Sequence, residues 1–332
     1  MKTLITGATG FIGSRLALRC RRDGMPVRAL GRRRSSVEED NARELEEAGA
    51  EIREVSIADR KPLADAMSGV EQVFHLAAAQ HEVNVPDEHF HAVNVEGTRN
   101  VFDAAEAAGV QRVVHASTIG VYNWRPGRTV GEDSPLEPDN IYGISKLAGE
   151  QVVQSYAGRV PFAIARISET YGPGDRRLLK LFKGAERGLL VQIGNGRNLH
   201  HLVYIDDLVE GLLIAARAEQ ALGRSFVLAG AAPVTSREML GAVSSAMGRP
   251  SRVIRLPLAP LRVAAALVEG VLRPLGVQPP LHPRRLDFFR KSFAFSLEEA
   301  TAVGYKPRVG LDEGMQATAR WYLNRGLVSL GS

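Results

Sequence analysis

The sequence predicts an α/β fold in which a parallel sheet carries helices on both faces, together with a smaller C-terminal α/β lobe. Short apolar runs, several of them β-branched, alternate with segments of helical periodicity over the first half of the chain. The runs are residues 2–6, 26–30, 51–55, 72–78, 112–118 and 162–168. Such alternation is typical of strand–helix–strand units, which build parallel sheets. We therefore expect the ligand site at the carboxyl edge of the sheet.

Size and composition limit the classes of protein that fit. At 332 residues and 45% hydrophobic residues, the chain can bury a large core and should form two closely associated domains. The net charge of +5 suits an acidic small-molecule ligand, and the few aromatic residues near the basic runs argue against nucleic acid. The single cysteine, Cys20, excludes an internal disulfide, and the apolar start is too short for a signal peptide. These features predict a cytoplasmic protein.

A glycine-rich turn follows the first predicted strand. Gly7, Gly10 and Gly13 are spaced G-x-x-G-x-x-G between that strand and a predicted helix. Gly7 permits a tight turn, Gly10 lets the backbone approach a pyrophosphate, and Gly13 lets the helix press on the sheet. The helix N-terminus then offers free N–H groups and a partial positive charge to the phosphates. This context predicts a Rossmann-type dinucleotide site rather than a plain turn.

The end of the second strand indicates which dinucleotide binds. Arg32 and Arg33 follow Gly31, where an NAD site usually has an acidic residue for the ribose hydroxyl. A guanidinium can instead hold a 2′-phosphate with two hydrogen bonds. NADP(H) is therefore favoured over NAD(H). The alternatives are a solvated basic loop, or an acid arriving from elsewhere, such as Asp59.

The candidate chemistry follows the fifth predicted strand. Ser117 and Thr118 end that strand. Tyr142 and Lys146 lie four residues apart, which places both on one face of a helix. A neighbouring ammonium and a nicotinamide cation stabilise a phenolate, so Tyr142 can exchange a proton with a substrate hydroxyl during hydride transfer. Lys146 would also hold the nicotinamide ribose, and Thr118 would orient the substrate oxygen.

The ordered motifs resemble those of the extended short-chain dehydrogenases/reductases, the NAD(P)-dependent epimerase/dehydratase superfamily. In chain order they are TGATGFIG, HLAA, NVEGTRN, STIGVY, YGISK, YGPGD and VYIDDLVEG, and residues 295–323 resemble the closing segment of that family. The resemblance covers nearly the whole chain and is specific for fold and cofactor class. It implies a dinucleotide-binding domain of residues 1–170, to which 201–222 returns. Residues 171–200 and 223–332 would form the substrate-binding lobe.

The same resemblance implies further site residues. Cofactor contacts are expected from Thr9, Phe11, Ile12, Ile57, Ala77 and Ala78. Asn94 would support the site by hydrogen bonding near the catalytic helix, although a helix-start role is the alternative. Tyr171 would form the wall near the nicotinamide. Family members commonly dimerise through a four-helix bundle, and residues 94–108 and 142–156 carry the small residues that suit such a homodimer.

Departures from the family's pattern limit the reaction. The family's sugar 4,6-dehydratases have an Asp-Glu pair directly after the Ser/Thr, whereas Ile119 and Gly120 stand there and cannot transfer a proton, so dehydration is disfavoured. Nucleotide-sugar epimerases often have an Arg-Asp pair where this chain has His200 and His201. Arg197 is the candidate replacement for binding a diphosphate, with a solvated turn as the alternative, and His200 is a second candidate substrate residue. No third ligand matches the two histidines, so no metal site is expected.

Two enzymatic interpretations and one non-enzymatic interpretation follow. The first is epimerisation of a nucleotide-linked sugar by hydride removal and return at one carbon. The second is net NADPH-dependent ketone reduction or alcohol oxidation, as in the family's hydroxysteroid-like and dihydroflavonol-like branches. The third is an NADP(H)-binding sensor or scaffold, which the presence of both Tyr142 and Lys146 disfavours.

Residues 256–276 are the one stretch that invites a membrane interpretation. Leu261, Val268 and Leu272 lie at helical spacing on one face, with charged residues off it. Charges inside so short a run argue against spanning. We expect an amphipathic helix packed over the substrate site.

Overall fold

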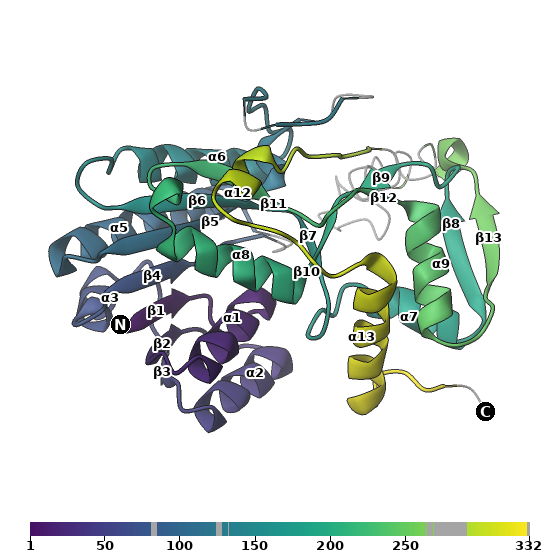
Figure 1. The fold of residues 1–332 in the computed structure, drawn as a ribbon, viewed down its shortest axis with the longest axis horizontal. Helices are drawn as coiled ribbons and strands as arrows, with labels where there is room; N and C mark the ends of the chain where they lie inside the picture. Colours follow the sequence, from purple (N-terminus) through teal and green to yellow (C-terminus); the bar gives the residue numbers. More distant parts are fainter. Residues whose placement is uncertain are drawn as a thin grey trace.

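The centre of the molecule is a seven-stranded sheet. The computed structural model describes residues 1–80, 85–123, 128–131, 133–261, 263, 268 and 291–330. The strand order of the central sheet is β11-β6-β5-β4-β1-β2-β3, and every neighbouring pair is parallel (Figure 1). The strands are β1 (Thr3–Thr6), β2 (Val27–Leu30), β3 (Glu51–Arg53), β4 (Gln72–His75), β5 (Arg112–Thr118), β6 (Phe162–Ile167) and β11 (Ser225–Leu228). The strand order reverses between β1 and β4, which leaves a crevice at their carboxyl ends.

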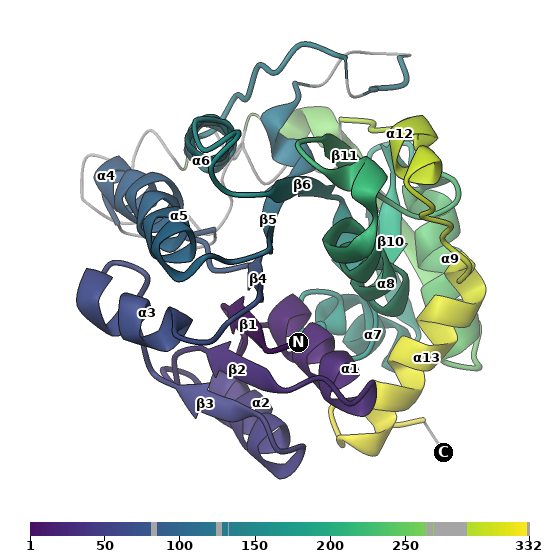
Figure 2. The ribbon, with the colours of Figure 1, turned by 60° about the vertical axis from the view of Figure 1, so that its left-hand side comes forward.

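Helices cover both faces of this sheet (Figure 2). One face carries α1 (Phe11–Arg22), α2 (Ser36–Glu47) and α8 (Ile205–Arg217), and the other carries α3 (Arg60–Met67), α5 (Gly97–Ala108) and α6 (Ile141–Gln154). Shorter elements are α4 (Asp87–His91), the π-helical turn Ala92–Glu96 and the 3-10 turns Ile119–Val121 and Glu219–Ala221. Each face therefore buries its own apolar cluster, as a doubly wound fold requires.

Among the described residues, the smaller lobe includes three strand pairs and the helices α7 (Leu179–Glu186), α9 (Ser236–Ala246), α12 (Glu298–Ala302) and α13 (Leu311–Asn324). The pairs are β7 (Glu169–Tyr171) with β10 (Leu202–Tyr204), β8 (Leu189–Ile193) with β13 (Arg252–Leu256), and β9 (Leu199–His200) with β12 (Val234–Thr235). Phe182 of α7 and Tyr322 of α13 pack edge to face, with ring centroids 4.9 Å apart. Both belong to the apolar cluster that contains α1 and α8, so the lobe shares a core with the sheet.

The structure confirms the predicted α/β fold and all six predicted strands, and it adds one strand. Ser225–Leu228 pairs with β6, so the chain's return to the central sheet extends past residue 222, the predicted boundary. This run of four residues carries no periodicity, and only its pairing identifies it as a sheet strand. Most of the helix predicted over 256–276 lies outside the described residues.

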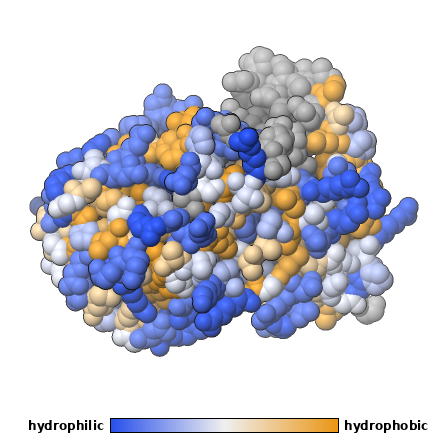
Figure 3. Space-filling view, turned by 45° about the horizontal axis from the view of Figure 1, so that its top comes forward, coloured by the Kyte–Doolittle hydropathy of each residue, from blue (hydrophilic) through white to orange (hydrophobic). Residues whose placement is uncertain are grey.

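No described helix combines the length and hydropathy needed to cross a bilayer. On the face in Figure 3, hydrophobic patches are interspersed among hydrophilic residues.

Candidate active site

The glycine loop is shaped by close backbone contacts. Gly7 has φ +69°, and a Cβ there would lie 2.9 Å from the Ala77 nitrogen. A Cβ on Gly13 would lie 2.2 Å from the Gly7 carbonyl oxygen, so only glycine lets α1 start this close to β1. The N-cap of α1 is Gly10, without a side-chain hydrogen bond or an acidic residue in the first turn. The helix therefore presents its N–H groups and positive end without a competing anion.

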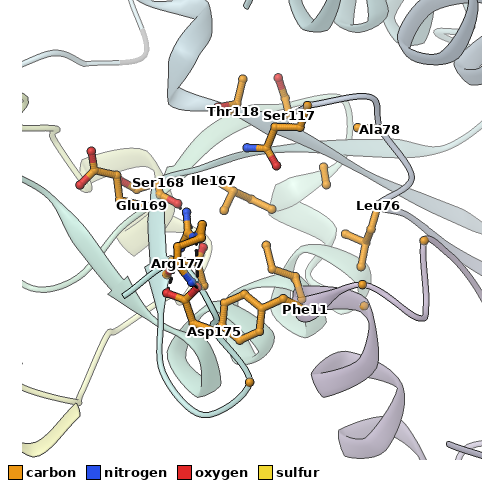
Figure 4. A pocket seen from close by; sticks show the side chains of 18 of the residues that line it. Phe11, Leu76, Ala78, Ser117, Thr118, Ile167, Ser168, Glu169, Asp175 and Arg177 are labelled. Atoms are coloured by element: carbon orange, nitrogen blue, oxygen red, sulfur yellow. Dashed lines mark hydrogen bonds and ion pairs between the residues drawn. The ribbon is translucent and has the colours of Figure 1, made fainter. Parts of the chain in front are cut away.

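A cavity of about 520 Å³, here called the main cavity, opens at the carboxyl edge of the sheet. The residues on its wall include Gly7, Gly10, Phe11, Ile12, Gly13, Ala78, Ser117, Thr118, Tyr142, Ser168, Glu169, Thr170 and Arg177. Figure 4 shows Ser117 and Thr118 on one side of it and Phe11 and Asp175 on the opposite side. The structure thus brings the glycine loop, the end of β5 and the smaller lobe to a single cavity.

A neighbouring cavity of about 260 Å³, here called the loop cavity, lies beside the end of β2. The predicted residues on its wall are Gly7, Thr9, Gly10, Arg32, Ile57, Ala77 and Ala78. Arg32 is exposed, its backbone N–H donates to Thr9 Oγ1 at 3.1 Å, and no described carboxylate forms an ion pair with its guanidinium. Arg32 is therefore available to an anion in this cavity.

Two charged side chains near the loop cavity, Arg33 and Glu38, have partners within the protein. Arg33 forms ion pairs with Glu39 (3.1 Å), Glu46 and Glu54 (3.5 Å). Glu38 lines the cavity, so the expectation of no carboxylate at this end is wrong. Its carboxylate accepts hydrogen bonds from the backbone N–H of Ser35 at 3.2 Å, in a capping box that starts α2.

Thr118 and Tyr142 form the polar centre of the main cavity. Both line this cavity, and the Thr118 hydroxyl accepts from the Gly120 N–H at 3.1 Å. Burial raises the pKa of Tyr142 to about 12, opposed by the hydrogen bond from Thr118. The expectation that Lys146 lowers this pKa is not met, since burial is the larger influence. The phenol is therefore protonated at neutral pH.

Lys146 lies behind the wall of the main cavity. It is 2% exposed, and its Nζ lies 3.4 Å from His115 Nε2. Burial lowers the pKa of Lys146 to about 8, although the carboxylate of Glu150 opposes this. Burial and the nearby ammonium hold the pKa of His115 well below its ordinary value, so this ring is a neutral neighbour of the lysine.

A buried ion pair that the sequence analysis did not identify supports this centre. Glu150, one helical turn beyond Lys146, is fully buried and pairs with Arg166 of β6 at 2.8 Å. Ser117 donates a hydrogen bond to the same carboxylate. Arg166 also donates to the Tyr122 hydroxyl at 2.6 Å. The i, i+4, i+8 spacing of Tyr142, Lys146 and Glu150 is visible in the sequence, but the partner on β6 is not.

Asn94 anchors the centre from the π-helical turn. Its side chain accepts from the Ala79 N–H at 2.8 Å and donates to the Ala79 carbonyl at 2.9 Å and to Ser145 Oγ at 2.9 Å. Asn94 therefore joins the loop after β4 to α6, the helix that carries Tyr142. These bonds match the supporting role expected for Asn94 rather than a helix-start role.

Three predicted residues lie elsewhere. Tyr171 is buried, packs against Tyr204 and does not line the main cavity. Arg197 is exposed in the turn before β9, where its N–H donates to Asn195 Oδ1 at 2.9 Å. His200 is buried, and its Nδ1 lies 3.0 Å from Glu169 Oε2 on the wall of the main cavity. His200 therefore does not line the main cavity itself but contacts Glu169, which does and which the sequence analysis did not single out.

His201 is used by the fold rather than by the cavities. Its Nδ1 accepts from the Phe295 N–H at 3.0 Å and its Nε2 donates to the Gly230 carbonyl at 2.8 Å. Within the described ranges, no group of three or more His, Cys, Asp or Glu side chains is placed to hold a metal ion.

Comparison with known proteins places this fold and cavity in a family. The model of the NAD dependent epimerase/dehydratase family matches residues 3–229, which include the glycine loop, Thr118, Tyr142 and Lys146. The chain belongs to this family. The match confirms the resemblance drawn from the motifs and the prediction of an enzyme.

Individual relatives from the family carry out different reactions. The chain is 30% identical to a UDP-glucose 4-epimerase of Mycolicibacterium smegmatis, over 98% of this chain and 99% of that one. It is also 30% identical to the 4-hydroxy-2-methyl-3-oxo-4-farnesyl-3,4-dihydroquinoline-1-oxide ketoreductase of Stigmatella aurantiaca, over 96% and 95%. The crystal structure of gox2253 superposes with a TM-score of 0.81 at 28% identity, covering 98% of this chain and 99% of that one. Equal identity to an epimerase and a ketoreductase means that the reaction must be argued from the site.

The site fits the dinucleotide after which the family is named. The uncapped N-terminus of α1 suits a diphosphate, because no acidic side chain stands in its first turn. A Cβ on Gly7 or Gly13 would collide with neighbouring backbone, so the loop keeps this shape only with glycine at both positions. The loop cavity and the main cavity both include Gly7 and Gly10, so one extended molecule can reach both across the loop.

Proposed function

We propose that this enzyme catalyses net hydride exchange at a ketone or secondary alcohol carbon, with NADP(H) as cosubstrate and Tyr142 as the acid/base. The supporting observation is that Thr118 and Tyr142 lie together on the wall of the cavity that contains the glycine loop. A bound nicotinamide supplies or accepts the hydride. The side chains of this chain then need only orient the substrate oxygen and move one proton.

Tyr142 can act as the proton donor in the direction of reduction. With its pKa raised to about 12 by burial, the phenol carries its proton at neutral pH and can donate it to a carbonyl oxygen. Thr118 provides the second hydroxyl for that oxygen. Lys146 acts from behind the wall, where His115 and Glu150 hold it one helical turn from Tyr142.

The substitution Tyr142→Phe tests this proposal. We expect kcat for NADPH-dependent ketone reduction to fall by about 100-fold to 10,000-fold, with NADPH affinity unchanged. Fluorescence titration of NADPH measures the second quantity. Unchanged turnover in the variant would remove Tyr142 from the mechanism.

Epimerisation of a nucleotide-linked sugar is the second candidate, supported by the identity to the mycobacterial epimerase. Sugar 4,6-dehydration is disfavoured, because Ile119 and Gly120 supply no acid or base after Thr118. Incubation with UDP-glucose and catalytic NAD(H) separates the two candidates. An epimerase would form UDP-galactose with no net change in absorbance at 340 nm, whereas our proposal predicts no conversion.

For the cofactor, we propose a preference for NADP(H) over NAD(H) that depends on Arg32. Its guanidinium is exposed at the loop cavity and has no ion pair among the described carboxylates. The role first expected for Arg33 is not proposed, because three glutamates surround its guanidinium.

We also propose a cytoplasmic homodimer assembled through α5 and α6. The support is Ile144 on α6, an apolar side chain that is 50% exposed between the buried positions of that helix. The single cysteine, Cys20, is buried, which suits a reducing compartment. Light scattering of the protein and of Ile144→Arg tests the assembly, with a monomer expected for the variant.

A further inference from the structure

A second large cavity lies inside the smaller lobe. This lobe cavity has a volume of about 470 Å³ and lies between β7, β8, α7 and α9. Its wall is mainly apolar, with Leu178, Leu181, Val191, Ile193, Met239 and Leu240 among its residues. The proposed reaction centre makes no use of it.

Two polar side chains on this wall, Gln192 and Ser236, are already hydrogen-bonded within the protein. Gln192 donates its side-chain amide to the Gly194 carbonyl at 3.2 Å. Ser236 donates to Asn198 Oδ1 at 2.9 Å. A ligand with many hydrogen-bonding groups, such as a nucleotide base, would find few unpaired partners here. An apolar ligand group needs no hydrogen-bond partners, so it can enter this cavity without leaving a polar group unpaired.

The lobe cavity adjoins the main cavity. Glu169, Thr170 and Arg177 line both. Thr170 lies on the short strand β7, which follows directly on β6 beside the end of β5 that carries Thr118. A molecule whose reacting carbon lies at Thr118 and Tyr142 can therefore extend into the lobe cavity.

The junction of the two cavities carries a carboxylate. Glu169 lines both cavities and accepts a hydrogen bond from His200 Nδ1 at 3.0 Å. Arg177, which lines both cavities, is paired with Asp175 at 3.0 Å and also donates to the Thr170 carbonyl. Arg176 lines only the main cavity, and Lys180 is exposed on the lobe cavity's wall. A diphosphate at the junction would therefore lie beside the Glu169 carboxylate and an arginine that is already paired, which is unfavourable.

We propose that the lobe cavity binds the apolar body of the substrate, and that Glu169, held by His200, excludes substrates with a diphosphate at the junction. The substrate class is therefore a ketone or secondary alcohol with a long alkyl or polycyclic apolar group. This inference rests on the proposed function, because it takes Thr118 and Tyr142 as the reacting end.

The binding experiment measures apolar chain length without turnover. Tyr142→Phe with NADP⁺ is titrated calorimetrically with 2-butanol, 2-hexanol and 2-octanol. Each added CH₂ should tighten binding by about fourfold, so 2-octanol, with four more CH₂ groups, should bind roughly 200-fold more tightly than 2-butanol. Equal affinity for all three alcohols would overturn the inference. Tight binding of 2-octanol with no turnover of any alcohol by the unsubstituted enzyme would contradict the proposed function instead.

A matched pair of variants assigns the effect to the lobe cavity. Val191 and Leu189 lie two residues apart on β8 and are 43% and 41% exposed, but only Val191 lines the cavity. Combined with Tyr142→Phe, Val191→Trp should remove most of the increase in affinity from 2-butanol to 2-octanol. Leu189→Trp in the same background should leave this increase unchanged. A gain that survives Val191→Trp would show that the alkyl group binds elsewhere.

The charge experiment tests Glu169 with UDP as the probe. UDP should inhibit ketone reduction weakly in the unsubstituted enzyme and at least tenfold more strongly in Glu169→Gln, which keeps the shape of the side chain. Inhibition that is equally strong in both proteins would overturn the exclusion. Turnover of UDP-glucose in preference to long-chain ketones would overturn the substrate class.

Discussion

The two ends of the proposed ligand site are built from different parts of the chain. At the proposed nucleotide end the site is formed by backbone: Gly7, Gly10 and Gly13 shape the loop, and α1 presents N–H groups at an N-terminus without a side-chain cap. At the lobe end, side chains from α7, β8 and α9 form an apolar cavity. The backbone end suits a ligand shared by a whole family, whereas the side-chain end can change by substitution without disturbing the loop.

The largest expected effect comes from disturbing the backbone end. Gly13→Val would place a Cβ 2.2 Å from the Gly7 carbonyl oxygen. Backbone atoms cannot move aside as the end of a flexible side chain can, so the loop must change its shape. We therefore expect NADPH affinity to fall by at least about 1,000-fold, measured by fluorescence titration. Gly241→Ala in α9, which has nothing within 4 Å of the new Cβ, is the control and should bind normally. Normal binding by Gly13→Val would mean that the loop is not the nucleotide site.

The catalytic centre between the two ends depends on buried side-chain charge. Glu150→Gln leaves the Arg166 guanidinium without its carboxylate partner in a buried site. We expect the free energy of unfolding to fall by about 3 kcal/mol, measured by urea denaturation. Glu106 forms a surface ion pair with Arg159. Its replacement with glutamine should lower the free energy of unfolding by less than about 1 kcal/mol. Equal losses in the two variants would argue against a buried role for Glu150.

Lys146 should make stability depend on pH. Burial lowers its folded pKa to about 8 from an ordinary value of 10.5, so between these values the unfolded chain binds a proton that the folded chain lacks. The free energy of unfolding contributed by this group should therefore rise with pH, by up to about 2 kcal/mol between pH 8 and pH 10. Urea denaturation of the unsubstituted protein and of Lys146→Met measures it. The difference in free energy of unfolding between the two proteins should change with pH in this direction. A difference that stays constant with pH would contradict the prediction.

The smallest expected effect concerns the outer part of the nucleotide end, where a side chain does contribute. Arg32→Ala should weaken NADPH binding by about tenfold and leave NADH binding nearly unchanged, because one charge-assisted contact to a phosphate is lost. Arg33→Ala is the matched control, since its guanidinium is paired with glutamates and should not affect the NADPH to NADH ratio. Tighter binding of NADH than NADPH by the unsubstituted enzyme would contradict the preference.

Local sequence patterns were sufficient for the fold and for the backbone part of the site. Alternating apolar runs predicted six of the seven sheet strands, and the glycine spacing predicted the loop. The spacing of Tyr142 and Lys146 predicted their shared helix face. These features depend on residues close together in the chain, so turn geometry and periodicity carry them.

Tertiary structure decided the features that depend on residues far apart in the chain. The Glu150–Arg166 pair joins α6 to β6, the Glu169–His200 contact joins two strands of the lobe, and Tyr171 turned into the core. The sequence predicted a lowered pKa for Tyr142 because of the nearby lysine. Burial, which no local pattern measures, raises this pKa instead. A pKa, an ion pair and a cavity volume each depend on what packs around a side chain, and those neighbours are chosen by folding rather than by sequence proximity.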